Sequence, residues 1–319
     1  MIEGWDEVHS TKFNTIKGLF TDLQIQRVLV VYKKSYYELY GYEHRERHFK
    51  ALESRHHPII QSMQLSHEEN KQTLAQVCVA LDAVGLAYDC IFRGELERTD
   101  GYDLVLSVGG DGTFLELARY TAGLPILGVN SDPARSMAFF CGANRQTIQQ
   151  QLEALIDGSL GEVRLARMEV RINDEQLPHA GLNDLLIAHA NPAAVSSYTL
   201  QVEQQEEQQK SSGIWIATAA GSTAAMRAAG GRVLPLRSRK LQYLVREPYA
   251  GDRQGYQLLK GEIASGQLLR VTSRMRRGRI FMDGSHLRFL FGLGDVLSVS
   301  SAADPVRVLG LDGHRRRRF

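Results

Sequence analysis

The stretch LVLSVGGDGTFLELARY, residues 104–120, is the feature that most restricts how this chain can fold. It begins with an unbroken apolar run, which is typical of a strand buried on both faces of a parallel sheet. A glycine-rich turn containing Asp111 follows, and the residues from Phe114 to Tyr120 are predicted to form a helix. A strand, a glycine turn and a helix in this order predict a unit whose turn lies at the carboxyl end of a parallel strand.

Segments on either side extend this pattern of strands and helices. The apolar runs 27–35 and 125–130 predict two further parallel strands. Apolar residues at helical spacing predict helices over 66–85 and 147–158, the first of them starting at a capping box that begins with Ser66. Strands that alternate with helices predict a Rossmann-like, doubly wound parallel sheet.

The pattern changes near residue 160. Apolar and polar residues alternate over 268–301, and turn residues recur there at Asp283 and Gly294. This alternation is typical of antiparallel strands that face a core on one side only. The sequence therefore predicts an α/β domain at residues 1–150 and a β-rich, sandwich-like domain at residues 151–319.

Composition argues against several classes of function. The chain has 319 residues and a net charge of +2, so it has no overall attraction for nucleic acid. No apolar run is long enough to span a bilayer, and the polar N-terminus lacks the apolar core of a signal peptide. We therefore expect a cytoplasmic protein without a membrane partner, with HRRRRF at its C-terminus as a solvated tail. The three cysteines, expected to be buried reduced thiols, are Cys78, Cys90 and Cys141.

The turn at residues 109–113 has the chemistry to receive a phosphate. Backbone N–H groups and the helix dipole attract anions where a helix begins, but the lysine of a Walker A loop is missing. Asp111 is positioned to deprotonate a hydroxyl beside a phosphate or to hold Mg²⁺, and both roles belong to phosphoryl transfer. Aspartate is also a common turn residue, so the motif alone leaves a structural role open. Lys33 and Lys34 end an earlier strand at the same edge, where phosphate contact is plausible.

Four segments together, in this order along the chain, resemble the motifs of the NAD kinase family. GGDGT at 109–113 is shared by NAD kinases and diacylglycerol-type lipid kinases. GLNDLLIA at 181–188 resembles the family's Asn-Glu/Asp segment, and SSGIWIATAAGSTAAMRAAGG at 211–231 resembles its second glycine-rich segment. FMDGSH at 281–286 resembles its late Asp-Gly turn.

This resemblance implies a fold and a reaction. The fold is an N-terminal α/β domain followed by a β-sandwich-like domain. The reaction is ATP-dependent phosphorylation of the 2′-hydroxyl on the adenosine ribose of NAD or NADH. The resemblance further implies ATP with Mg²⁺ or another divalent cation, no metal site of the protein's own, and a homodimer.

The same resemblance assigns roles residue by residue. By the GGDGT match, Asp111 would be the general base. The residues along the dinucleotide pyrophosphate would be Gly110, Gly112 and Thr113. The residues in contact with the adenosine or ribose would be Asn183 and Asp184, whose short polar side chains also suit a turn or cap. The residues lining the dinucleotide pocket would be Ser222, Thr223 and Ala224.

Two departures from the family pattern bear on the substrate. Ser212 stands where the family commonly has Asp, and Ala225 stands where it commonly has Tyr. VNSDPARSMAFF at 129–140 also replaces the usual VNxGxLGFL. These changes resemble a branch that includes plant NADH kinases and mitochondrial-type NAD kinases. We retain Ser212 as a substrate-binding residue and predict that NADH is phosphorylated at least as efficiently as NAD.

Two other functions remain alternatives. A lipid kinase of the diacylglycerol type would share GGDGT and the two-domain plan, and a dinucleotide sensor would bind without turnover. The Asn183-Asp184 pair and the AAGSTAA run favour a dinucleotide over a lipid, and Asp111 favours catalysis. Because no Walker A lysine marks an ATP site, inorganic polyphosphate is also an open choice of donor.

Overall fold

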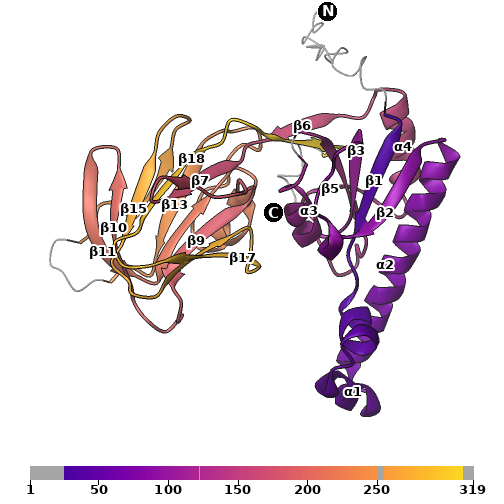
Figure 1. The fold of residues 1–319 in the computed structure, drawn as a ribbon, viewed down its shortest axis with the longest axis horizontal. Helices are drawn as coiled ribbons and strands as arrows, with labels where there is room; N and C mark the ends of the chain where they lie inside the picture. Colours follow the sequence, from indigo (N-terminus) through magenta and orange to yellow (C-terminus); the bar gives the residue numbers. More distant parts are fainter. Residues whose placement is uncertain (1–24, 122, 250–254, 312–319) are drawn as a thin grey trace, which may run out of the picture.

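The computed structural model describes residues 25–121, 123–249 and 255–311, and it contains a parallel α/β layer beside a sandwich of two antiparallel sheets (Figure 1). The N-terminal segment, where we expect no signal peptide, and the HRRRRF segment lie outside these described residues. Within them, no helix combines the length and the apolar character that crossing a membrane requires.

The first sheet has seven strands, and all neighbours except β6 run parallel. In spatial order the strands are β2 (Ala87–Phe92), β1 (Arg27–Tyr32), β3 (Leu104–Gly109), β4 (Pro125–Asn130), β19 (Val306–Leu309) and β6 (Glu162–Leu165), and β5 (Cys141–Asn144) also pairs with β4. Every residue of β3 and β4 is buried, which is why both read as unbroken apolar runs in the sequence.

Helices cover both faces of this sheet (Figure 1). The helices α2 (Pro58–Ala83) and α4 (Ile148–Ile156) lie on one face, and α3 (Asp111–Leu117) lies on the face toward the sandwich. Alternate residues of a strand point to opposite faces, so Val30 of β1 packs in the cluster with α2 and Val31 packs in the cluster with α3. The shorter helical segments η1 (Tyr37–Glu43), α1 (Arg47–Ser54) and η2 (Arg93–Glu95) complete this layer.

Two predicted helix starts are wrong. The helix α2 begins at Pro58, and His57 caps it by accepting a hydrogen bond from the N–H of Ile59. Proline suits a first helical position because its missing N–H has no partner there in any helix. Ser66 therefore lies inside the helix. The helix α3 begins at Asp111 instead of Phe114, so the catalytic candidate belongs to the helix itself.

The prediction that all three cysteines are buried is also wrong. They are free thiols, but only Cys141 is buried, whereas Cys90 is exposed. The Sγ atoms of Cys78 and Cys90 lie 3.9 Å apart, at the contact between α2 and β2.

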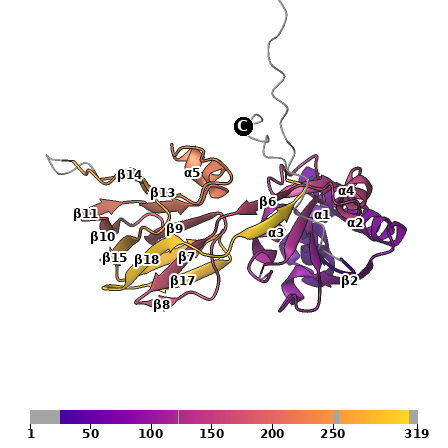
Figure 2. The same ribbon diagram turned by 90° about the horizontal axis from the view of Figure 1, so that it is seen from above.

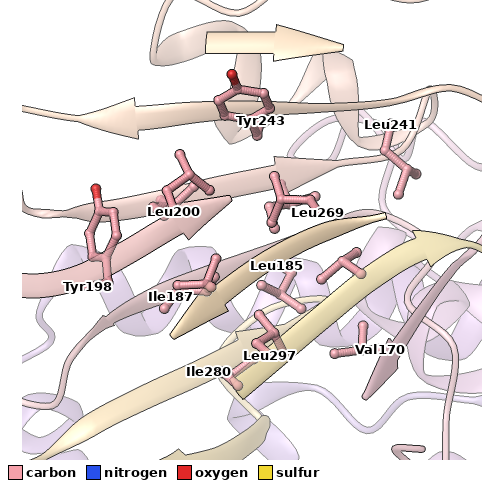
Figure 3. Packing of buried hydrophobic residues seen from close by; sticks show 14 of the residues in the cluster. Val170, Leu185, Ile187, Tyr198, Leu200, Leu241, Tyr243, Leu269, Ile280 and Leu297 are labelled. Atoms are coloured by element: carbon pink, nitrogen blue, oxygen red, sulfur yellow. The ribbon is translucent and has the colours of Figure 1, made fainter. Parts of the chain in front are cut away.

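The second layer is a sandwich of two six-stranded antiparallel sheets. One sheet contains β11 (Gln205–Ser211), β10 (Ser196–Val202), β15 (Leu269–Ser273), β18 (Val296–Ser301), β7 (Met168–Ile172) and β8 (Glu175–Gln176). The other contains β14 (Lys260–Ile263), β13 (Leu241–Arg246), β12 (Gly213–Ala217), β9 (Asp184–His189), β16 (Gly278–Met282) and β17 (Leu287–Phe291). Figure 3 shows the core between them, where Leu185, Ile187, Tyr198 and Leu297 meet.

The chain crosses between the two layers twice. It leaves the α/β layer after β6, and β19 returns to it from the sandwich to lie between β4 and β6 (Figure 2). The first sheet therefore includes strands from beyond residue 150. Side chains also join the layers, because Leu182 and Ala220 pack in the same apolar cluster as Phe114 and Phe140.

Candidate active site

Asp111 is held at the first position of α3, directly after β3. Its Oδ1 accepts a hydrogen bond of 2.9 Å from the backbone N–H of Phe140. The Phe140 ring stacks on Phe114 with centroids 5.0 Å apart, so the residue that orients Asp111 is fixed by the core beneath α3. A Cβ at Gly109 would overlap the Thr113 side chain, which explains the glycine that precedes the turn.

The other predicted residues of this turn differ in exposure. Gly112 is exposed and Gly110 is half-buried, so their backbone can be approached by a ligand. Thr113 is 1% exposed, and its hydroxyl has no hydrogen-bond partner among the described residues. The structure thus places the Thr113 side chain beneath the turn and not on its surface.

Asn183 and Asp184 lie on the sandwich side of the junction, where Asp283 holds their backbone. The carboxylate of Asp283 accepts hydrogen bonds from the N–H groups of Leu182 and Asn183, at 2.9 and 2.7 Å. The N–H of Asp283 in turn donates to the carbonyl of Asp184 at 2.9 Å. The side-chain amide of Asn183 donates to Asp184 Oδ2 at 3.0 Å.

Asp184 has an unusual proton affinity for a carboxylate. Burial raises the pKa of Asp184 to about 7, and repulsion from Asp283 contributes to the rise. Burial also raises the pKa of Asp283, but the N–H groups of Leu182 and Asn183 stabilise its charged form. Because these two N–H groups favour the charge on Asp283, Asp184 is the member of the pair that takes up a proton as the pH falls below about 7.

The second glycine-rich segment supports the loop that carries Asn183. The hydroxyl of Thr218 donates to the carbonyl of Leu182 at 2.5 Å. A Cβ at Gly221 would overlap the carbonyl oxygen of Asn183, so only glycine allows the two backbones to approach this closely. The segment therefore holds the carbonyl side of this loop, whereas Asp283 holds its N–H groups.

The hydroxyls predicted to line the dinucleotide pocket are used within the protein. Ser222 is fully buried, and its Oγ donates to the carbonyl of Ala219 and accepts from the N–H of Leu234. Thr223 is half-buried and donates to the carbonyl of Ala220 at 3.2 Å. Ala224 is exposed, so of these three residues it presents the most surface to a ligand.

A cavity of about 480 Å³ lies on the outer face of the sheet that contains β9, β12 and β16. It brings together two of the predicted residues, Asp184 and Ser212, and its wall also includes Trp215, Arg246 and Phe281. The guanidinium carbon of Arg246 lies 5.8 Å from the centroid of the Trp215 ring. Asp111 and the GSTA residues, at 221–224, are not in the wall of this cavity.

The segment that departs most from the family pattern, residues 129–140, forms a braced loop after β4. The N–H of Asp132 donates to Asn130 Oδ1, and the amide of Asn130 donates to the carbonyl of Ser136. Ser66 of α2 donates to Asp132 Oδ2 at 2.7 Å, which fixes the loop to the helix. Arg135 pairs with the other oxygen of Asp132 at 3.0 Å.

Several residues that build the site were not among the predicted ones. Asp283 and Thr218 lie inside matched motifs, so their motif membership was the available signal. Phe140 acts through its backbone N–H, and no side-chain pattern can reveal that contact. Arg246 ends strand β13, outside the four segments that carry the resemblance to the family, and the sheet pairing brings it to Ser212.

The described residues offer no cluster for a protein-bound metal. No group of three or more histidine, cysteine, aspartate or glutamate side chains is arranged to hold an ion there.

Proteins with similar sequences identify the family of this chain. Residues 12–160 match the family model of the ATP-NAD kinase N-terminal domain. A "Probable NADH kinase" of Oryza sativa subsp. japonica is 38% identical over 229 residues, which are 65% of this chain and 70% of the rice protein. An "NADH kinase" of Arabidopsis thaliana is 34% identical over 229 residues, covering 65% of this chain and 72% of that protein.

Solved structures share the fold and confirm the predicted architecture. An NAD kinase from Archaeoglobus fulgidus in complex with ATP superposes with a TM-score of 0.64 at 19% identity, over 92% of this chain and 96% of the other. Yeast NADH kinase complexed with NADH superposes with a TM-score of 0.68 at 12% identity, over 92% and 86%. The identity of the two plant relatives, together with the family model, shows that this chain belongs to the NAD kinase family and is an NAD(H) kinase.

Proposed function

We propose that this NAD(H) kinase transfers the γ-phosphoryl group of ATP to the 2′-hydroxyl on the adenosine ribose of NADH or NAD. The observation that carries the proposal is the position of Asp111 at the junction of the two layers. Phe140, which orients Asp111, packs in one cluster with Leu182 and Ala220, the neighbours of Asn183 and Gly221. The carboxylate and the dinucleotide-binding segments therefore face one site from two sides.

Asp111 acts as the general base. Its carboxylate takes the proton of the 2′-hydroxyl as that oxygen forms a bond to the γ-phosphorus. The bond from the γ-phosphorus to the bridging oxygen breaks, and ADP leaves with the electron pair. Positioning and charge compensation dominate such transfers, and the N–H of Phe140 fixes the direction of the base.

The dinucleotide is held from both layers. The amide of Asn183 and the carboxyl of Asp184 bind the adenosine and its ribose, because their backbone is fixed by Asp283 and Thr218. Gly110 and Gly112 allow the pyrophosphate to approach the backbone of the turn. The GSTA residues give the pocket its shape, since the Ser222 hydroxyl is occupied internally.

Magnesium enters with ATP in this proposal. It would supply positive charge that neutralises the phosphates, and the carboxylate of Asp111 would be the group of this chain that contacts it.

We further assign the cavity beside Ser212 to the nicotinamide end of the substrate. An oxidised nicotinamide carries a positive charge and a reduced one is neutral. The cavity has Ser212 where the family commonly has an acid, and the Arg246 guanidinium adds positive charge to its wall. Both features favour NADH, and the names of the rice and Arabidopsis relatives agree with this choice.

Steady-state kinetics test the proposal. The acceptors are NAD, NADH and diacylglycerol, and the donors are ATP with Mg²⁺ and inorganic polyphosphate. Turnover of a dinucleotide with ATP is expected, with NADH at least as good as NAD. Turnover of the lipid alone would contradict the proposal, and binding of dinucleotide without turnover would identify a sensor. Light scattering on the same sample tests the proposed homodimer.

A further inference from the structure

A lysine stands at the point of the α/β sheet where ligands bind in this class of fold. The strand β1 is followed in the chain by β2 on one side and then by β3 on its other side, so the strand order reverses between β1 and β3. In open α/β sheets the crevice outside the carboxyl ends of the strands at such a reversal is the usual ligand site. Lys33 directly follows β1, and its N–H donates to the carbonyl of Val108 at 3.2 Å. It therefore lies beside Gly109 and the start of the GGDGT turn.

The two adjacent lysines differ in what they contact. The Nζ of Lys34 lies 2.6 Å from Glu43 Oε1 and 4.5 Å from the centroid of the Phe92 ring, so its charge is already compensated. The Lys33 ammonium has no ion pair and no side-chain hydrogen bond to any residue that the structure describes. Among the described residues, Lys33 is thus the cation at this edge that is open to a ligand anion.

The surroundings of Lys33 favour the binding of an anion beside its ammonium group. Burial lowers the pKa of Lys33, and Asp132 offsets only part of the effect. The two carboxylate oxygens of Asp132 already accept hydrogen bonds from Ser66 and Arg135. A partly buried ammonium without a counter-ion is costly, and a polyanion beside it would remove that cost.

The sheet order indicates which phosphate Lys33 meets. The strands β4, β19 and β6 lie on the sandwich side of β3, and β1 lies on the opposite side of β3 (Figure 1). The dinucleotide segments belong to the sandwich, so the acceptor reaches Asp111 from that side. The attacking and leaving oxygens lie roughly in line through the transferred phosphorus, which places the donor on the side of β1.

We propose that the Lys33 ammonium binds the β- and γ-phosphates of the donor ATP, across Gly109 from Asp111. This assignment rests on the proposed function for its identification of the donor. It gives the enzyme a positively charged donor subsite on β1, in place of the lysine that a Walker A loop carries within its own turn.

The test compares Lys33→Met with Lys34→Met, a matched control that removes the same charge one residue away. Binding of a non-hydrolysable ATP analogue with Mg²⁺ is measured by calorimetry without any dinucleotide. Lys33→Met is expected to weaken this binding about 10- to 100-fold, as for the loss of a charged hydrogen bond. Lys34→Met is expected to change it less than about threefold, and Lys33→Arg is expected to retain most of the affinity. In turnover assays, Lys33→Met should raise the KM for ATP and leave the KM for NADH unchanged.

Three results would overturn the assignment. They are unchanged analogue binding in Lys33→Met, an equal loss in Lys34→Met, or a raised KM for NADH with normal analogue binding. Circular dichroism and the melting temperature check folding, and Lys33→Gln repeats the test if the methionine variant does not fold. Failure of the proposed function is recognised separately. A wild-type enzyme that binds the analogue but phosphorylates no dinucleotide would refute the reaction and leave the analogue data on Lys33 standing.

Discussion

The surroundings of Asp111 and Asp184 suit the two carboxyl groups to different chemical roles. Asp111 is half-buried and accepts a hydrogen bond from the N–H of Phe140, which orients its carboxylate for the role of a base. Asp184 is 7% exposed and lies beside Asp283, which favours the protonated form. A protonated carboxyl can donate a hydrogen bond to a ribose or adenine acceptor, whereas a carboxylate can only accept.

Replacing Asp111 by Asn should abolish turnover without disturbing the fold. Asn is nearly the same size and its carbonyl still accepts from the N–H of Phe140, but it cannot take the ribose proton. The expected loss in kcat is ~10²–10⁴-fold, with NADH affinity unchanged. Single-turnover rates and NADH fluorescence titrations measure the two quantities. A near-normal kcat would remove Asp111 from the chemistry.

Replacing Asp184 by Asn should change how stability depends on pH. The pKa of Asp184 is about 7 in the folded protein, against an ordinary value of 3.8 for an aspartate carboxyl. The folded state thus keeps a proton that the unfolded chain releases, so this residue's contribution to the unfolding free energy is complete below about pH 4. As the pH rises from about 4 to about 7 this contribution is lost, and the unfolding free energy falls by at most about 4 kcal/mol. Urea midpoints of wild type and Asp184→Asn between pH 5 and 8 measure the difference. Parallel curves would show that Asp184 titrates normally.

Replacing Ser212 by Asp should shift the preference toward NAD. A carboxylate near an oxidised nicotinamide attracts its charge by roughly 1 kcal/mol at 4 Å in water, which corresponds to about a fivefold change. The ratio of kcat/KM for NAD to that for NADH is expected to rise by about this factor. Ser212→Asn adds similar bulk without charge and should leave the ratio unchanged. An unaltered ratio in the Asp variant would place Ser212 away from the ring.

At the scale of elements, local chemistry explains both what the sequence predicted and what it did not. The strands β3 and β4 were predictable because burial on both faces demands an unbroken apolar run. The start of α2 was missed because the capping box at Ser66 looks like a helix start, although the helix begins at Pro58, about two turns earlier. The strand β19 was not predicted, because four residues carry little pattern and their partners are distant in the chain.

The residues of the candidate site likewise include some that the local sequence predicts and some that it does not. GGDGT identified Asp111 because the motif is local. The contact from the Phe140 N–H depends on the path of the loop after β4, which no local pattern encodes. The burial of Ser222 and Thr113 likewise follows from the packing of neighbouring elements and not from their own residue types.

The close approach between the GSTA segment and the Asn183 loop should be sensitive to a single methyl group. Gly221→Ala would place a Cβ against the Asn183 carbonyl, so one of the two backbones must move. We expect a loss of about 1–3 kcal/mol in stability. A raised KM for NADH should accompany it. The control is Gly161→Ala, where the added methyl group meets no atom within 4 Å. Equal behaviour of the two variants would show that the contact does not position Asn183.

At the scale of the whole molecule, the α/β layer depends on β19, a strand that the chain supplies only after it has completed the sandwich. Removing the chain from Val306 onward would leave an empty position between β4 and β6, while the sandwich core would keep all its strands. We expect the truncated protein to lose kinase activity and the melting transition of the α/β layer. The sandwich transition should remain, as followed by calorimetry. A truncated protein with the wild-type melting profile would contradict this dependence.

The position of β19 in the chain also constrains how the protein is made. A nascent chain commonly completes its first domain before the next is synthesised. Here the ribosome finishes β4 at Asn130 and soon adds β5, which pairs with the end of β4. The partner strand of Pro125 and Ile126 comes only at Val306, after every strand of the sandwich. At roughly 5–20 residues per second, the wait lasts on the order of ten seconds to half a minute. During that time the edge of β4 at Pro125 and Ile126 can pair with other strands, and we expect a chaperone that binds nascent chains to protect it.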